Sequence, residues 1–366
     1  MAPPNSKTGN ASILTHQPGV GTLQAVWLFL CAFAYRHLCE FIFFRFKLLD
    51  RQFWAKQKPD RITSYPSRPT LRHHVFIPAS HREGQKHALY LIVHGVAYIV
   101  GTPATDHAQA RFLADRHEYV VVVISYRRAP EHRFPTAIHD VAAVIEAVLV
   151  DSSLPIDTKR VVLGGFSAGA SLILGVGQLP SLQNRISALV PFQPATDRTG
   201  SVRGAYPSSM PWGGPDDMEK TKTLADWAYP TPGQNLRDKL LSPYHATRKD
   251  IPQPVCFVTG GADMLCREGY LLACKLADRR PEVNAEDSSN PAPSDGGKKA
   301  EAEEASSSWE QGQVKYWCAK DMPHGFTHFW VVLPQQGGWR ATQLKRQDEA
   351  WHEVTGWLDR VLYPSK

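Results

Sequence analysis

The sequence lacks the features that mark several classes of protein. It contains no basic tract of five or more residues and no nucleic-acid-binding motif, although Lys and Arg number 41 against 35 acidic residues. It also contains no Cys-x-x-Cys pair, and no cysteines and histidines stand at the spacing of a zinc site. We therefore expect neither a nucleic-acid partner nor a metal, and the net charge of +6 indicates only a mildly basic surface.

Cysteine is scarce and scattered. Two of the six cysteines, Cys256 and Cys318, lie in apolar runs typical of strands, where buried free thiols are expected. The other four are Cys31, Cys39, Cys266 and Cys274. Nothing in the spacing of the six supports a disulfide, so they fit a protein of a reducing compartment.

A long uncharged apolar run is absent as well. The stretch 23–49 is apolar and aromatic, but the charges of Arg36, Glu40, Arg45 and Lys47 interrupt it. The uncharged part, 25–35, is shorter than the roughly 20 residues that cross a bilayer, so a membrane-spanning anchor is less favoured, and a cleavable signal less still. Arg36, Glu40 and Lys47 share one helical face, which predicts a helix lying on an apolar surface. That surface is either the active-site mouth of the protein or a membrane interface, so the location is predicted to be cytoplasmic or membrane-associated.

The chain divides into segments of different composition. Residues 1–22 have little periodicity and are expected to form a flexible tail, and residues 23–64 an apolar N-terminal cap or membrane-associated helix. Residues 65–366 are long enough for one catalytic domain. Within it, residues 199–241 are rich in Pro, Gly, Trp and Asp, which indicates part of a cap. Residues 282–311 are polar and low in complexity, which predicts a disordered insertion.

From residue 71 onward, strand and helix patterns alternate. The run VVVVI within 119–126 is β-branched and apolar throughout, as expected of a strand buried on both faces. This alternation predicts a mostly parallel central sheet with helices on both faces. Strands are predicted at 71–77, 88–94, 119–126, 160–166, 187–192, 254–259 and 314–319, and helices at 136–150, 168–178, 269–277 and 341–362.

The strongest local motif is Gly-Phe-Ser-Ala-Gly at 165–169. It follows a predicted strand and opens a predicted helix, which is the context of a nucleophile elbow. Such a turn holds Ser167 clear of the sheet edge, and Gly165 and Gly169 let the strand and the helix pack closely there. We therefore interpret Ser167 as a nucleophile.

A serine nucleophile needs a base that is held by an acid. Asp263 follows the predicted strand 254–259, and His324 follows the strand 314–319, so both lie at carboxyl ends of strands in the order Ser, acid, His. The competitors fit less well: His328 lies in an apolar run and is expected to be packed, His352 lies on the last helix and is expected at the surface, and Glu268 is placed to begin a helix.

The motifs together resemble the hormone-sensitive-lipase family of α/β hydrolases, which includes arylacetamide deacetylase-like esterases. The similar segments are HGVAYIVGTP, SYRRAPEHRFPTAIHD, GGFSAGA, SPY followed by TGGADML, and MPHGF, in the order of the family and over residues 65 to 362. The resemblance implies an α/β-hydrolase fold and hydrolysis of short- and medium-chain carboxylic esters without a cofactor. It implies Ser167, Asp263 and His324 as the triad.

In this family the loop that begins at His94 and Gly95 contributes to the oxyanion hole. The resemblance implies that the amides of Val96, Ala97 and Ala168 form it. Two positions depart from the family pattern: Phe166 stands where the family has Asp, and Val96 and Ala97 stand where it has glycines. Because a β-branched residue resists positive φ, we expect Val96 to keep a negative φ.

The segment from Ser125 to Pro135 is interpreted as structural, with Glu131 paired to a nearby arginine. Three functions remain open. The first is a serine esterase acting on small to medium apolar esters. The second is an acyltransferase, thioesterase or lactonase in a biosynthetic pathway. The third is a non-catalytic ligand receptor, as in the gibberellin receptors of plants, which resemble this family but lack the triad histidine; the presence of His324 counts against it.

Overall fold

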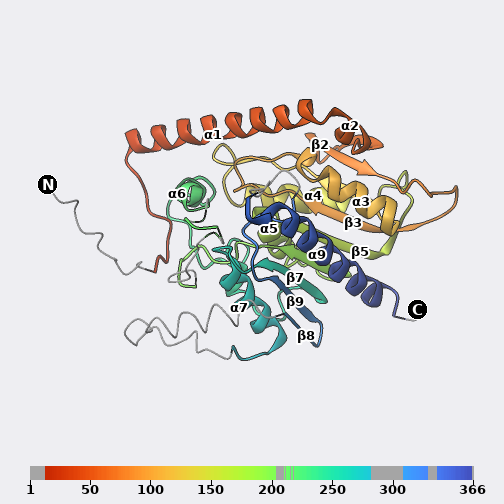
Figure 1. Ribbon diagram of the computed structural model, residues 1–366. Helices are drawn as coiled ribbons and strands as arrows, with labels where there is room; N and C mark the ends of the chain where they lie inside the picture. Colours follow the sequence, from red (N-terminus) through yellow and green to blue (C-terminus); the bar gives the residue numbers. More distant parts are fainter. Residues whose placement is uncertain are drawn as a thin grey trace.

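One large β-sheet forms the centre of the computed structural model (Figure 1). The structure describes residues 13–202, 210, 212–214, 216, 218–281, 308–328 and 336–364. Within them the sheet has nine strands in the order β1-β2-β4-β3-β5-β6-β7-β9-β8. The strands are β1 (Arg61–Tyr65), β2 (Arg68–Phe76), β3 (His87–Val93), β4 (Val120–Ile124), β5 (Ile156–Phe166), β6 (Ala188–Phe192), β7 (Val255–Gly260), β8 (Trp309–Gln311) and β9 (Val314–Ala319).

The middle of the sheet is parallel, and its edges are antiparallel. Strands β4, β3, β5, β6, β7 and β9 all run in one direction, whereas β1 and β2 at one edge and β8 at the other pair antiparallel. A parallel core brings the carboxyl ends of several strands to one edge, where open α/β sheets build their sites. The predicted mostly parallel sheet is confirmed.

The apolar strands separate two cores. In β4, Val120, Val122 and Ile124 belong to the larger cluster of buried side chains, while Val121 and Val123 belong to the cluster on the opposite face. All five are fully buried. This alternation results from the two-residue period of a strand. Because every residue of the run is apolar, the strand can be buried on both faces of the sheet.

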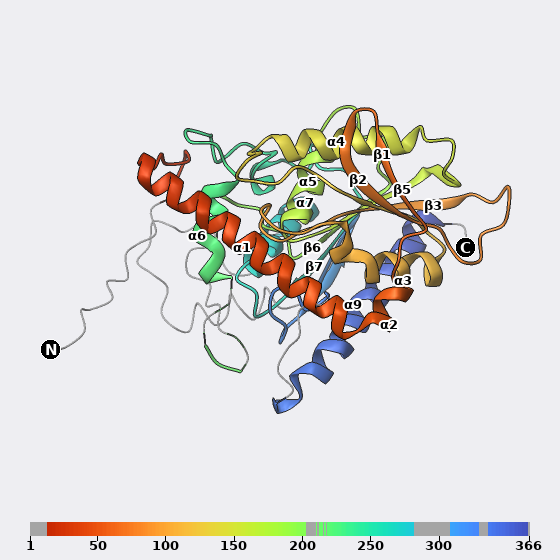
Figure 2. The same cartoon turned by 90° about the horizontal axis from the view of Figure 1, so that it is seen from above.

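Helices cover both faces, as Figure 2 shows from above. The larger core is closed by three helices and the smaller by two, which pack their apolar sides on the sheet. The three are α4 (Thr136–Leu149), α5 (Ala168–Val176) and α7 (Cys266–Ala277), and the two are α3 (His107–His117) and α9 (Trp339–Leu362). Short 3-10 turns occur at Pro103–Asp106, Pro243–His245 and Gln336–Gly338.

Several elements were not predicted, among them β1, α3 and β8. The α3 sequence, HAQARFLADRH, has too few apolar residues for a clear helical period, and the two strands are short edge strands. β8 also corrects the predicted disorder of residues 282–311. Its residues Trp309–Gln311 pair with β9, and the Trp309 ring stacks on Tyr316 with centroids 5.7 Å apart. Residues 282–307 lie outside the described residues.

The N-terminal part packs on the body. The expected flexible tail, residues 1–22, is wrong at Leu14–Gln17, because the Leu14 amide donates to Thr199 and the Gln17 amide to Gln234. Residues 1–12 lie outside the described residues. A long helix, α1 (Thr22–Leu49), and a short one, α2 (Arg51–Lys56), follow, and α1 runs across one side of the molecule next to α6 (Glu219–Ala228) (Figure 1).

The six cysteines are free, as expected. Four are buried, and Cys31 and Cys39 on α1 are partly exposed. No disulfide therefore constrains the docking of α1, which rests on packing and on polar contacts.

Candidate active site

Ser167 occupies a sharp turn between β5 and α5. Its backbone has φ 53° and ψ −114°, and its amide donates to the Phe192 carbonyl at 2.8 Å. A Cβ on Gly165 would lie 2.6 Å from the Gly169 carbonyl carbon, and one on Gly169 would collide with the Val93 carbonyl oxygen. Both motif glycines are thus required for the close packing of strand and helix that the sequence predicted.

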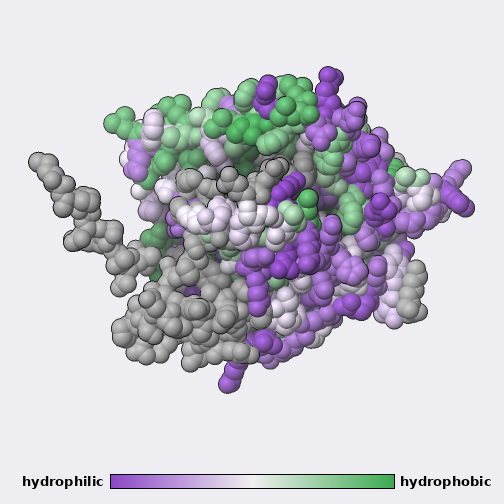
Figure 3. Space-filling model, viewed as in Figure 1, coloured by the Kyte–Doolittle hydropathy of each residue, from purple (hydrophilic) through white to green (hydrophobic). Residues whose placement is uncertain are grey.

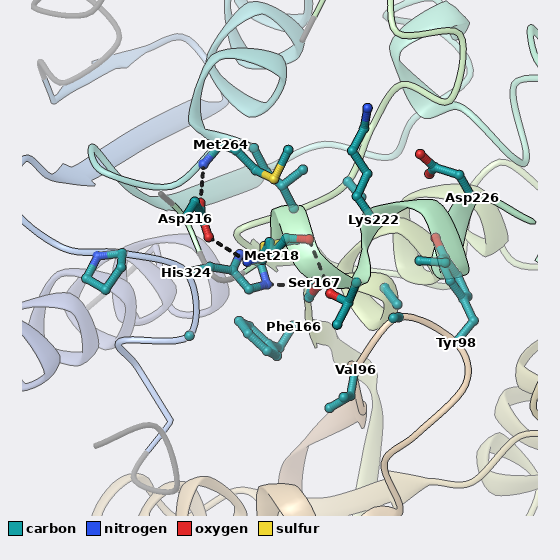
Figure 4. A pocket seen from close by; sticks show the side chains of 18 of the residues that line it. Val96, Tyr98, Phe166, Ser167, Asp216, Met218, Lys222, Asp226, Met264 and His324 are labelled. Atoms are coloured by element: carbon teal, nitrogen blue, oxygen red, sulfur yellow. Dashed lines mark hydrogen bonds between the residues drawn. The ribbon is translucent and has the colours of Figure 1, made fainter. Parts of the chain in front are cut away.

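The structure brings Ser167, His324 and Asp263 into one hydrogen-bonded chain, of which Figure 4 shows Ser167 and His324. Ser167 Oγ lies 2.9 Å from His324 Nε2, and His324 Nδ1 lies 2.8 Å from Asp263 Oδ2. Beside an ionised Asp263, Nδ1 carries the proton and donates it, which leaves Nε2 as an acceptor for the serine hydroxyl. This geometry allows His324 to remove the serine proton.

Asp263 is held by several donors. The side chain is fully buried, its Oδ1 accepts from the Leu265 amide at 2.9 Å, and its Oδ2 also accepts from Gln193 Nε2 at 2.9 Å. Gln193 Oε1 in turn accepts from the Gly325 amide at 2.8 Å. Gln193 therefore joins the acid to the loop that carries His324.

Gln193 was not singled out in the sequence. It follows β6, a neighbour of both β5 and β7, so its place at a carboxyl strand end was the available signal.

The loop after β3 faces Ser167. Val96, Ala97 and Ala168 all line the cavity above the serine. Among the described residues the amides of Val96 and Ala97 have no protein acceptor, and Ala168 is the first residue of α5, where an amide has no partner within the helix. Free amides beside the nucleophile are the donors that an oxyanion hole requires.

The expected negative φ at Val96 is wrong. Val96, Ala97 and Tyr98 have φ values of 70°, 58° and 64°, three consecutive non-glycine residues in the left-handed region. Tertiary contacts hold this path: the Val96 carbonyl accepts from the Val100 amide at 3.1 Å, and the buried Tyr98 ring stacks on Tyr229 with centroids 3.7 Å apart.

Comparison with known proteins agrees with this geometry. Residues 90–290 match a family described as alpha/beta hydrolase fold. The chain belongs to the hormone-sensitive-lipase family of α/β hydrolases.

Relatives in this family include several named hydrolases. An arylesterase of Saccharolobus solfataricus is 34% identical over 108 residues, which are 29% of this chain and 35% of the arylesterase. An arylacetamide deacetylase of Oryctolagus cuniculus is 34% identical over 109 residues, or 28% and 27% of the two chains. The matched regions of these curated relatives are only about a third of their length.

A similar structure covers more of the chain. A hyperthermophilic esterase from Pyrobaculum calidifontis superposes with a TM-score of 0.64 over 93% of this chain and 98% of its own, at 20% sequence identity. At that identity the likeness shows the fold, and the α/β-hydrolase fold expected from the sequence is confirmed.

In this hormone-sensitive-lipase family member, a cavity of about 480 Å³ lies above Ser167. Tyr35 of α1 and Ala225 of α6 both line it, so the two segments predicted as a cap enclose the site together with the sheet edge. Apolar side chains from the cap, the oxyanion loop and the carboxyl ends of strands dominate its wall, including Val96, Phe166, Met210, Met218 and Met264.

A second buried carboxylate, Asp216, lies beside the triad (Figure 4). It accepts from the amides of Met218 at 2.9 Å and Met264 at 3.0 Å. Burial and the negative charge of Asp263 raise the pKa of Asp216 above its usual value. This acid was missed in the sequence because it falls in a segment without periodicity.

Phe166, the residue that replaces the family Asp, lies between two imidazoles. Its ring centroid is 4.9 Å from that of His324 and 4.0 Å from that of His328. His328 is buried, as expected, and its Nε2 lies 3.2 Å from Asp106 Oδ1. Phe166 thus supports one face of the triad histidine by packing.

The other competitors have no place in the triad. His352 is exposed, as expected, and Glu268 lies in the first turn of α7, where its buried carboxylate accepts from the Thr196 amide at 2.9 Å. The fully buried His94 stacks on Tyr126 with centroids 4.3 Å apart, and burial lowers the pKa of His94 to about 4. A neutral His94 therefore supports the start of the oxyanion loop.

Ala97→Gly tests the strain in this loop. A left-handed backbone costs a non-glycine residue about 1–2 kcal/mol, and glycine costs roughly 0.5–1 kcal/mol in chain entropy. We expect the variant to be as stable as the wild type or up to about 1 kcal/mol more stable in urea unfolding. The control Ala341→Gly, in the first turn of helix α9, should lose up to about 1 kcal/mol. An equal loss in both variants would mean that Ala97 is not strained.

Proposed function

We propose that the protein hydrolyses carboxylic esters of small to medium apolar substrates through an acyl-enzyme on Ser167. The observation that carries this proposal is the hydrogen-bonded chain from Ser167 through His324 to Asp263, which opens into a largely apolar cavity. The names of the relatives, among them an arylesterase and an esterase, support it.

The reaction follows from the positions of the donors and acceptors. Ser167 Oγ attacks the acyl carbonyl carbon while its proton passes to His324 Nε2. The negative charge that develops on the carbonyl oxygen faces the free amides of Val96, Ala97 and Ala168. His324 then gives its proton to the leaving alcohol, and the acyl group stays on Ser167.

Water completes the cycle. It enters in place of the alcohol, His324 Nε2 removes its proton, and the hydroxide attacks the acyl-enzyme carbonyl. When the second tetrahedral intermediate collapses, His324 returns the proton to Ser167 Oγ, and the acid leaves. Asp263 stays ionised throughout and stabilises the imidazolium.

A panel of p-nitrophenyl esters from acetate to palmitate tests the proposal. Each methylene buried in the apolar cavity adds about 0.8 kcal/mol, or up to roughly fourfold in kcat/KM. We expect kcat/KM to rise with acyl length up to about four to eight carbons, since a cavity of this size falls within the usual range for small-molecule sites.

The alternative reactions give different results in the same assay. An acyltransferase would form the acyl-enzyme in one burst and turn over only when an alcohol, amine or thiol acceptor is added. A receptor would release no p-nitrophenol with any ester. Either result would contradict ester hydrolysis as the function.

A further inference from the structure

Helix α1 exposes a wide apolar face to solvent, whereas its side toward the protein combines the buried Ala32 with the charged Arg36, unlike an ordinary surface helix. Trp27, Leu30 and Phe41 are 66%, 55% and 59% exposed, whereas Arg36 is only 9% exposed. Figure 3 shows apolar residues gathered along the edge of the molecule over α1. The other exposed apolar side chains of this helix are Leu23, Val26, Phe29, Phe33, Leu38, Ile42, Phe44, Phe46, Leu48 and Leu49.

The charges in the middle of α1 are bound to the body of the protein. Arg36 donates two hydrogen bonds of 2.7 Å to the Glu131 carboxylate and further ones to the Ile99 and Ala129 carbonyls. Glu40 pairs with Arg128 at 3.0 Å. These contacts hold α1 along the surface of the catalytic domain, and a helix that crossed a bilayer would have to give them up and bury both charges in lipid.

The length and direction of α1 also fit an interface. By length and composition this helix is apolar enough to cross a membrane, and its 28 residues extend about 42 Å, beyond the roughly 30 Å of a hydrocarbon core. Because α1 is docked against the body of the protein, its apolar face is exposed to solvent along the whole length of the helix. Arg45, near the C-terminal end, is the charged residue on this face, and a helix with one wide apolar face lies in the plane of a membrane interface.

Exposed cations surround the C-terminal end of α1. Arg45, Arg51, Lys56 and Lys58 are exposed, and Asp50 is the exposed acidic residue among them. An excess of basic residues beside an apolar face is complementary to an anionic lipid surface.

A narrow apolar cleft of about 210 Å³ lies beneath the same helix. Ile42 and Phe46 of α1 line it on one side, and Val100 lines it on the other. Tyr35 and Val96 line both this cleft and the cavity above Ser167. The cleft therefore joins the apolar face of α1 to the oxyanion loop.

We propose that α1 lies in the plane of an anionic membrane and that the cleft beneath it admits ester substrates dissolved in that membrane. This inference rests on the proposed ester hydrolysis and names its substrate class: acyl esters that partition into lipid. The helix binds the interface through its exposed apolar face, and the acyl chain reaches Ser167 past Tyr35 and Val96 without passing through water.

Sedimentation with vesicles of phosphatidylcholine containing 30% phosphatidylglycerol tests the membrane surface. We expect the full-length protein to bind these vesicles at least tenfold more tightly than pure phosphatidylcholine vesicles. The double variant Trp27→Glu/Phe41→Glu should lose at least tenfold in binding. The matched control, Val150→Glu/Leu344→Glu, changes exposed apolar residues on other elements and should bind as the wild type does. Absent binding, equal binding to both lipids, or equal binding by both double variants would overturn the proposal.

A fluorescent label distinguishes a helix that lies in the plane of the membrane from one that spans the membrane. Residues 27 and 41 lie about 21 Å apart along the helix axis. In a Cys31→Ser/Cys39→Ser background, a label at Trp27→Cys or Phe41→Cys should be quenched equally by nitroxide lipids of shallow depth. One deep and one shallow position would show a spanning helix and contradict the proposal.

The entry route is tested by two assays on one preparation. We expect the Trp27→Glu/Phe41→Glu variant to keep its rate on soluble p-nitrophenyl acetate but to lose at least tenfold on a decanoyl ester dissolved in anionic vesicles. Loss of neither rate would overturn the route. If the wild type lacks activity on the soluble ester, the proposed hydrolysis fails, whereas the vesicle-binding result still decides the membrane surface.

Discussion

Replacing Ser167 with alanine is expected to lower kcat on p-nitrophenyl butyrate about 10⁶-fold, by analogy with triad serines elsewhere. The hydroxyl is the atom that becomes acylated, and without it His324 has no nucleophile to activate. The measurement is steady-state hydrolysis, with the amount of folded protein checked by circular dichroism.

Ser171→Ala is the matched control. Ser171 lies one turn further along α5, is equally buried, and donates to the Ala195 carbonyl rather than facing the cavity. We expect this variant to lose less than about tenfold in kcat, because the loss of one neutral hydrogen bond costs only about 1 kcal/mol. Similar losses in both variants would show that Ser167 acts through packing and not as the nucleophile.

Arg36→Ala is expected to destabilise the protein by roughly 1–3 kcal/mol, because the buried guanidinium loses its hydrogen bonds to the partly exposed Glu131 and to two backbone carbonyls. The guanidinium also holds the Ile99 and Ala129 carbonyls, and the Ala129 amide donates to the Tyr98 carbonyl at 3.0 Å. The change should therefore release α1 and loosen the oxyanion loop. We expect kcat/KM on butyrate esters to fall at least tenfold, measured together with urea unfolding.

Two further variants separate the role of this contact from general destabilisation. Arg36→Lys keeps the charge but not the planar fork that fits Glu131, so it should recover part of the stability and only a small part of kcat. Arg61→Ala removes a more exposed arginine that pairs with Asp151 far from the loop, and should leave kcat nearly unchanged. A normal kcat in Arg36→Ala, with α1 still protected from protease, would contradict the link between α1 and the oxyanion loop.

The triad was accessible to sequence reasoning because each member follows a recognisable strand. β5, β7 and β9 each contain a run rich in apolar residues, and parallel strands bring their carboxyl ends together. Ser167, Asp263 and His324 could therefore be placed at one edge before their distances were known. The interior strands and the helices that cover them followed from the same periodicity.

Other parts of the site depend on contacts between distant segments. The positive φ of Val96 opposes its own local preference and is held by the neighbouring fold, including the stacking of Tyr98 on Tyr229. The sequence of α1 indicated that its charged residues share one face, but not which way that face points. The ion pairs with Glu131 and Arg128 turn it toward the protein. The pairing of Glu131 with an arginine was expected, yet the partner proved to be Arg36, 95 residues away.

The most direct test of the catalytic assignment is to treat the full-length protein with a fluorophosphonate and to map the adduct by mass spectrometry. The expected result is a single phosphonylated residue, Ser167, because its hydroxyl alone among the described serines is hydrogen-bonded to a histidine that an aspartate orients. The adduct should be absent from Ser167→Ala and should form at least a hundredfold more slowly in His324→Ala. An adduct on any other residue, or none at all, would contradict Ser167 as the nucleophile.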